Sequence, residues 1–197
     1  MGVGRSSFDG RDSYYHLDLD SCAKALSATG GRLHPALGFA ASPPSALVFD
    51  PPPVVLFACT GNSARSPIAE ALLRHHTAGR VGVASAGSHP RPHIHPAAVR
   101  VLRDEYGIDI SDQHPQHLAT LTDRRFDYVI SLCDKVREVC PSFPDKPRLI
   151  HWSIPDPAAA DSDDQDHHAV FRRTAAAINT RVRHLLSVLA HAQEAQA

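Results

Sequence analysis

The sequence is short of cysteine and has no long run of apolar residues. Four cysteines in 197 residues are too few for a secreted disulfide framework and indicate reduced thiols in a cytosol. No apolar run approaches the ~20 residues that a membrane-spanning helix needs, and the first twenty residues lack the hydrophobic segment of a signal peptide. We therefore expect a cytoplasmic protein without a membrane partner.

An excess of charge of one sign is also missing. The formal net charge is −1, so no strong electrostatic field attracts nucleic acid, and we expect no nucleic-acid partner. The fourteen histidines suggest a metal site, chiefly at His89, His93 and His95 in SHPRPHIHP. Because they alternate with proline in an extended loop without nearby cysteine or carboxylate ligands, we interpret these three as solvated loop histidines.

The segment ACTGNSARSP carries the strongest chemical signal. It follows the apolar run 54–58 and precedes IAEALL, which predicts a strand, a tight loop and a helix, with Cys59 at the carboxyl end of the strand. Inward-pointing N–H groups of such a loop and the helix N-terminus would cradle a tetrahedral oxyanion and favour the thiolate form of Cys59. Arg65 can grip two oxygens of the anion at once, and Ser66 is placed to donate a hydrogen bond to the sulfur.

The loop between the strand and the helix is expected to bind the substrate anion. Gly61 is expected to give the backbone freedom for a close approach, and Asn62 tolerates a left-handed conformation. A buried structural cysteine is the alternative for Cys59, since free cysteines are often buried. The expected binding residues are Thr60, Gly61, Asn62, Ser63, Ala64 and Arg65.

This loop resembles the anion-binding loop of the low-molecular-weight protein tyrosine phosphatase family, which includes the thioredoxin-coupled arsenate reductases. The similarity continues through VASAGSHP, HPAAVRVLRDEYGIDIS, FDYVISLCDKVREVCP and HWSIPDPA, and so covers roughly residues 54–189. The resemblance implies the fold of that family, a nucleophilic Cys59 and no tightly bound organic cofactor.

Two further cysteines distinguish the branches of the family. Cys133 and Cys140 stand in SLCDKVREVCP, and the thioredoxin-coupled arsenate reductases have such a pair at this spacing. The resemblance implies that Cys59 attacks arsenate, that Cys133 then attacks Cys59 and releases arsenite, and that Cys140 attacks Cys133 to form a disulfide that thioredoxin reduces. A low-molecular-weight thiol system is the alternative reductant. Two structural thiols or a zinc pair are the alternative roles, although zinc favours shorter spacings and four ligands.

Asp156 in HWSIPDPAAAD is the candidate general acid. A carboxylic acid on a mobile loop can protonate a leaving oxygen, and Pro155 and Pro157 restrict where it points. A solvated loop aspartate is the alternative. Phosphatases of this family usually have aromatic residues after the Asp-Pro pair, whereas residues 158–160 are alanines. This difference favours a small inorganic anion over phosphotyrosine, with a phosphatase as the alternative function and residual activity on small aryl phosphates.

The resemblance also implies a potassium site. Asn62, Glu70 and Ser85 match positions that bind the ion in some relatives. Some reductases of the family carry another cysteine at the position of Ala64. The lack of a thiol at this position removes one off-pathway oxidation.

From residue 54 onward, expected strands and helices alternate. Strands are expected near 54–58, 81–86, 126–132 and 149–152, and helices near 67–76, 96–106 and 166–191. This order predicts an α/β fold, a four-stranded parallel sheet with helices on both faces, in a catalytic domain over 54–197. Because ligands bind at the carboxyl ends of such strands, Cys59 and Cys133 are expected to converge on one pocket.

The first fifty residues do not follow this pattern. GRDSYYHLDLDSCAKALSATGGRLHPAL predicts a short strand and a helix from Ser21 to about Thr29, and the Pro-rich residues 41–53 predict a linker. Residues 1–40 resemble the end of arsenic-responsive winged-helix repressors. The resemblance implies the remnant of a repressor fused to a reductase, without the recognition helix. It also implies a rival function, an arsenite-responsive transcriptional regulator fragment in which Cys22 helps to hold arsenite.

Overall fold

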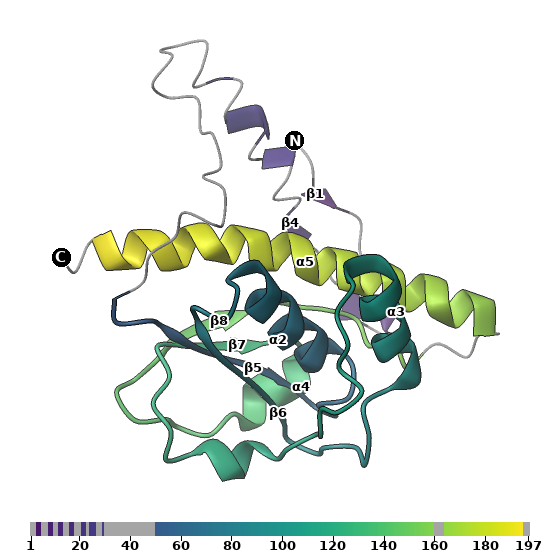
Figure 1. Ribbon diagram of the computed structural model, residues 1–197, viewed down its shortest axis with the longest axis horizontal. Coiled ribbons are helices and arrows are strands. Elements are labelled where there is room, and N and C mark those ends of the chain that lie inside the picture. Colours follow the sequence, from purple (N-terminus) through teal and green to yellow (C-terminus); the bar gives the residue numbers. More distant parts are fainter. Residues whose placement is uncertain are drawn as a thin grey trace.

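The computed structural model describes residues 50–159 and 164–194, together with short pieces of the first thirty residues (3–4, 8–9, 12–13, 16–17, 21–22, 24–26 and 29). Its core is a four-stranded parallel sheet with the strand order β6-β5-β7-β8 (Figure 1). The strands are β5 (Val54–Cys59), β6 (Gly82–Gly87), β7 (Tyr128–Ser131) and β8 (Arg148–His151). The predicted parallel sheet is confirmed.

Strand β5 lies inside the sheet because its sequence is apolar without interruption. Residues 55–58 are fully buried, as is typical of a parallel strand covered on both faces. The register pairs Cys59 with Gly87 on β6 and Ala58 with Ser131 on β7. The carboxyl ends of the three strands therefore lie at one edge of the sheet, and Cys59 lies between the segments that follow β6 and β7.

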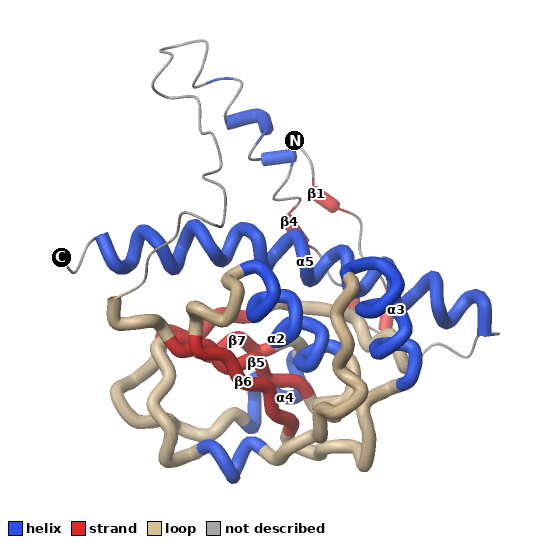
Figure 2. Tube along the Cα trace, in the orientation of Figure 1, coloured by secondary structure: helices blue, strands red, loops and turns tan. Residues whose placement is uncertain are grey.

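The helices cover both faces of the sheet, as predicted. They are α2 (Arg65–His76), α3 (Pro96–Tyr106), α4 (Asp134–Val139) and α5 (Asp164–Glu194), with a 3₁₀ helix η3 (Leu118–Leu121) in the loop between α3 and β7 (Figure 2). The steps β5–α2–β6 and β7–α4–β8 cross the sheet in opposite directions, so right-handed crossovers place α2 and α4 on opposite faces. Helix α5 packs against α2 and α3. None of the described helices, α5 included, is long and apolar enough to cross a lipid bilayer.

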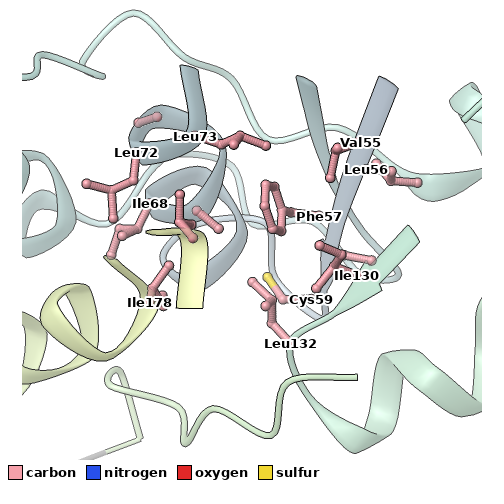
Figure 3. Close-up of a cluster of buried hydrophobic side chains, with 14 of the residues drawn as sticks. Val55, Leu56, Phe57, Cys59, Ile68, Leu72, Leu73, Ile130, Leu132 and Ile178 are labelled. Atoms are coloured by element: carbon pink, nitrogen blue, oxygen red, sulfur yellow. The ribbon is translucent and has the colours of Figure 1, made fainter. Parts of the chain in front are cut away.

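The main apolar core lies between the sheet, α2 and α5. Phe57 of β5, Ile68 and Leu72 of α2 and Ile178 of α5 are fully buried in one cluster (Figure 3). Helix α5 enters it through an apolar face at helical spacing, which includes Phe171, Ile178, Val182, Leu185 and Leu189. Cys59 belongs to the same cluster and is 2% exposed, so its sulfur lies where the core meets the loop.

The N-terminal pieces contain two antiparallel strand pairs. β1 (Val3–Gly4) pairs with β4 (His16–Leu17), and β2 (Phe8–Asp9) pairs with β3 (Asp12–Ser13) between them. Residues 21–22, 24–26 and 29 are helical, within the helix predicted from Ser21 to about Thr29. The sequence predicted a single short strand before this helix, and the pairing of four short strands was not predicted. Most of the predicted linker, 41–53, lies outside the described residues.

Candidate active site

The loop between β5 and α2 encloses the sulfur of Cys59. The backbone N–H of Asn62 donates to the sulfur at 3.2 Å, and the hydroxyl oxygen of Ser66 lies 3.0 Å from it. Both partners are buried. Helix α2 begins at Arg65, so its N-terminus faces the same space. The N–H donor, the hydroxyl and the helix dipole together favour negative charge on the sulfur.

Asn62 fixes the shape of this loop. Its φ of 44° is left-handed, as the sequence suggested. Its side-chain NH₂ group donates to the hydroxyl oxygens of Ser66 and Ser85, each at 2.9 Å, and its carbonyl oxygen accepts the backbone N–H of Gln116 at 2.8 Å. Because the Gln116 N–H can only donate, this network determines the orientation of the amide. The Ser66 oxygen accepts from Asn62, which leaves the Ser66 proton available to Cys59.

The closest backbone approach is at Gly87 and not at Gly61. A Cβ added at Gly87 would lie 2.5 Å from the backbone oxygen of Thr60, which no side chain tolerates. At Gly61 the nearest atoms, on Arg91 and Ser63, lie 3.3 Å away, and φ is not left-handed. Glycine is therefore also required at the end of β6, where it lets the loop pass.

Arg65 ties the loop to the segment that follows β8. Its Nη1 donates to the carbonyl oxygen of Ile154 at 3.0 Å, and its Nη2 donates to Oδ2 of Asp156 at 2.9 Å. The Arg65 side chain is 7% exposed and the Asp156 side chain 39% exposed. The other carboxylate oxygen of Asp156 accepts the backbone N–H of Ala158 at 3.2 Å. The predicted acid is thus held beside the predicted nucleophile loop, and it is not a freely solvated side chain.

One cavity of about 500 Å³ joins these groups. Its walls include Cys59, Asp156 and five of the six expected anion-binding residues: Thr60, Gly61, Ser63, Ala64 and Arg65. Asn62 and Ser66 do not line the cavity but contact the sulfur of Cys59 from within the protein. The segment His89–Pro90–Arg91–Pro92 also lines the cavity, and we did not predict it as part of the site.

The second cysteine lies next to the anion loop but does not line the cavity that Cys59 lines, so the two thiols do not share one pocket as we expected. The sulfur of Cys133, at the N-terminal cap of α4, lies 3.3 Å from the hydroxyl oxygen of Thr60. Cys140 caps the other end of α4 and is half-buried, and this burial raises the pKa of its thiol. All four cysteines of the described residues are free thiols.

Three polar side chains around the start of α4 form a chain of contacts. Ser131 and His151 end strands β7 and β8 as register partners, and Ser131 Oγ lies 2.7 Å from His151 Nδ1. His151 Nε2 lies 2.8 Å from a carboxylate oxygen of Asp134, the first residue of α4. Nε2 of His151 forms no hydrogen bond, so this contact is a close approach of the ring to the carboxylate and not an aligned hydrogen bond. These contacts link α4 to β7 and β8.

The loop histidines differ from one another. His89 and His93 are exposed, as predicted, but His95 is partly buried. Its Nδ1 caps α3 by accepting the backbone N–H of Ala97, and its ring stacks on Phe171 with the centroids 4.5 Å apart. Burial lowers the pKa of His95, the nearby His167 lowers it further, and Asp156 acts in the opposite direction. Among the described residues, no group of three or more His, Cys, Asp or Glu could hold a metal ion.

The residues expected to bind potassium do not fit the ion. Asn62 turns its NH₂ group toward Ser85, so it offers a donor where a cation needs an oxygen. Glu70 is already paired with Nη2 of Arg74 at 2.6 Å, and the same nitrogen donates to the carbonyl oxygen of Val83 at 3.3 Å. The guanidinium of Arg74 therefore takes the place of an external cation beside Glu70.

The fold and this site define a class of protein. Residues 54–195 match the family model described as low molecular weight phosphotyrosine protein phosphatase. The chain belongs to this family.

The chain is similar to named arsenate reductases and to a phosphatase. An arsenate reductase of Halalkalibacterium halodurans is 36% identical over 130 residues, 66% of this chain and 92% of that protein. The solved thioredoxin-dependent arsenate reductase of Corynebacterium glutamicum is 30% identical with a TM-score of 0.55, over 87% of this chain and 71% of that one. A solved arginine phosphatase from Geobacillus stearothermophilus is 26% identical with a TM-score of 0.60, over 74% of this chain and 98% of that one.

Proposed function

We propose that this protein is an arsenate reductase that uses three of its own thiols and an external thiol reductant. The observation that carries the proposal is the position of Cys133, whose sulfur lies 3.3 Å from the hydroxyl of Thr60, the neighbour of Cys59. A phosphatase of this family needs one thiol. Reduction of arsenate to arsenite takes two electrons, which two thiols supply when they form a disulfide. The similarity to named arsenate reductases supports the proposal.

The first step joins the substrate to Cys59. Its thiolate attacks the arsenic of arsenate bound in the loop, and one arsenic–oxygen bond breaks. Asp156, in its protonated form, donates its proton to the leaving oxygen, which departs as water, while Arg65 holds Asp156 at the cavity by the 2.9 Å contact. The product is a Cys59–arsenate adduct in which arsenic is still As(V).

The second step is the reduction. The thiolate of Cys133 attacks the sulfur of Cys59, and the sulfur–arsenic bond breaks with its electron pair staying on arsenic. Arsenite, As(III), leaves, and the two sulfurs form a Cys59–Cys133 disulfide. Thr60 supports this step because its hydroxyl holds the Cys133 sulfur beside the loop.

The third step restores the nucleophile. Cys140 attacks Cys133, the thiolate of Cys59 leaves, and a Cys133–Cys140 disulfide remains. We propose thioredoxin as the dithiol that reduces it, because the solved relative from Corynebacterium glutamicum is thioredoxin-dependent. Such a cycle needs a compartment that keeps thiols reduced, and we therefore propose the cytoplasm.

Arsenate-dependent oxidation of NADPH, in the presence of thioredoxin and thioredoxin reductase, tests the function. We expect continuous oxidation that stops when arsenate, thioredoxin or the protein is left out. A parallel assay replaces thioredoxin with a low-molecular-weight thiol and its reductase. Turnover only with the low-molecular-weight thiol would show that this thiol, and not thioredoxin, is the reductant. No turnover in either assay would refute arsenate reduction.

Phosphatase activity is the second candidate function. Cys59, Arg65 and Asp156 surround the cavity without help from Cys133, and a solved relative is an arginine phosphatase. Ala158 lines the cavity just after the Asp-Pro pair and offers no aromatic surface for a phenyl ring. We therefore expect slow hydrolysis of small aryl phosphates and weaker activity on phosphotyrosine peptides, measured side by side.

We further propose that the catalytic domain spans 54–197 and that residues 1–40 are a remnant of a winged-helix repressor. Two antiparallel strand pairs precede the helical residues 21–22 and 24–26. They support that interpretation, because at the end of such a repressor a wing strand is followed by a helix. DNA binding is not part of the proposed function. A gel shift with arsenic-operator DNA, with and without arsenite, should show no complex, and an arsenite-sensitive complex would establish the rival function.

A further inference from the structure

The segment after β6 is fastened to the back of the anion loop. Loop N–H groups that point at an anion leave their carbonyl oxygens pointing outward, and these oxygens need donors. The backbone N–H groups of Ser88, His89, Arg91 and His95 supply them, donating to the carbonyl oxygens of Cys59, Thr60, Gly61 and Ser63 at 2.8–3.3 Å. Pro90 and Pro92, which have no N–H, occupy positions between these donors. The segment is therefore held in register with the loop.

This register places the side chain of Arg91 at the cavity. Its backbone N–H donates to Gly61 at 2.8 Å, and its Cγ lies 3.3 Å from the point where a Cβ of Gly61 would be. The aliphatic part of the side chain thus lies against the one loop residue that has no side chain. Arg91 lines the same cavity as Cys59 and Arg65 and is exposed to solvent.

The two guanidinium groups of the cavity differ in charge balance. Arg65 is neutralised by Asp156 at 2.9 Å. Arg91 forms no ion pair with any residue in the described part of the chain. Of the two arginines at the cavity, Arg91 is therefore the one whose positive charge is free to attract an incoming dianion.

We infer that Arg91 is a specificity-determining residue that favours doubly charged tetrahedral oxyanions, acting on their capture by the loop. This inference deepens the proposed function and rests on it for arsenate, whereas for phosphate, which has the same shape and charge, it stands independently. A charge at the mouth of a cleft raises the local concentration of an opposite charge and the rate of encounter. Salt screens this attraction, with a Debye length of ~10 Å at 0.1 M ionic strength.

Binding of inorganic phosphate to the reduced protein tests the inference by isothermal titration calorimetry. The variants are Arg91→Gln, which removes the charge, Arg91→Lys, which keeps it, and Arg100→Gln, which removes an exposed arginine of α3 outside the cavity. At about 20 mM NaCl we expect Arg91→Gln to weaken phosphate binding by roughly five- to tenfold, and at about 300 mM NaCl by much less. Arg91→Lys and Arg100→Gln should bind phosphate nearly as the native protein does.

Two results would overturn the inference. One is native phosphate affinity of Arg91→Gln at low salt. The other is an equal loss in Arg91→Lys and Arg91→Gln, since charge would then not be the cause. Thermal melting of each variant checks that the fold is intact. Failure of arsenate reduction would leave the phosphate result interpretable, because binding of the anion needs neither Cys133 nor Cys140.

Discussion

At the scale of single residues, Arg65 serves two partners through the fixed fork of its guanidinium. One nitrogen bonds to Ile154 and the other to Asp156, so the loop that carries the acid depends on the geometry of the fork as much as on its charge.

We predict that Arg65→Lys lowers kcat and raises KM together. A lysine keeps the charge but cannot hold both partners at once, and misplacing a catalytic group by about 1 Å costs on the order of a hundredfold in rate. Steady-state kinetics with arsenate measure the effect. The exposed Arg103, paired with Asp109 on the surface, offers Arg103→Lys as the control. Native kinetics of Arg65→Lys would contradict the role given to the fork.

The buried thiol of Cys140 predicts a pH dependence for the third step. Because burial raises its pKa, Cys140 stays protonated to higher pH than an exposed thiol, and only its thiolate attacks. The step should therefore accelerate with rising pH, about tenfold per unit below the pKa. After one turnover without reductant, mass spectrometry should find more of the Cys59–Cys133 disulfide at low pH and more Cys133–Cys140 at high pH. A ratio independent of pH would contradict this.

Site residues that lie in one contiguous segment could be predicted from the sequence, whereas several that reach the site from remote segments could not. Cys59, Arg65 and Ser66 were predictable because one contiguous strand–loop–helix segment holds them. Gln116, His151 and Arg91 could not be predicted, since each reaches the site by a contact with a segment remote in sequence. The requirement at Gly87 was also hidden, because it arises from the backbone of Thr60 passing over the end of a neighbouring strand.

At the scale of elements, α4 separates the two resolving thiols. It spans Asp134–Val139, with the cysteines as its caps. Seven residues at 1.5 Å each put the two Cα atoms roughly 10 Å apart along the axis, whereas a disulfide needs about 7 Å or less. Among its residues only Val136 is buried, so few apolar contacts hold the helix.

We predict that formation of the Cys133–Cys140 disulfide unwinds α4. Hydrogen exchange should show the amides of 134–139 losing protection after one arsenate turnover without reductant. Cys140→Ser, which stops at the Cys59–Cys133 disulfide, is the matched control and should keep its protection. Unchanged protection in a sample shown by mass spectrometry to carry the Cys133–Cys140 bond would refute the switch.

The elements themselves followed largely from the sequence. The apolar periodicity of 166–191 and the proline and glycine that bound 96–106 specify α5 and α3 locally. The attachment of residues 88–95 to the anion loop was missed, because it consists of backbone hydrogen bonds that leave no side-chain pattern. The two nested strand pairs near the N-terminus were missed for a similar reason, since strands of two residues are too short to show an alternation.

At the scale of the whole molecule, we predict that stability and turnover do not depend on potassium, because the protein's own Arg74 already pairs with Glu70. Thermal melting in equal concentrations of potassium and sodium chloride should give the same Tm, and arsenate turnover should not differ between the two salts. Arg74→Met removes the partner of Glu70 and should lower Tm in both salts. A potassium-specific rise in the Tm of the native protein would show that the ion binds despite the geometry at Asn62 and Glu70.

Cys133 supplies the second thiol for the two-electron reduction, at a site otherwise built for phosphoryl chemistry. The most direct test measures arsenate reduction and aryl-phosphate hydrolysis in Cys133→Ser, with Cys59→Ser as the control that should lose both activities. We predict that Cys133→Ser loses multiple-turnover arsenate reduction and keeps most of its phosphatase activity, because Cys133 lies beside Thr60 and does not line the cavity. Repeated turnover of arsenate by Cys133→Ser would contradict the account.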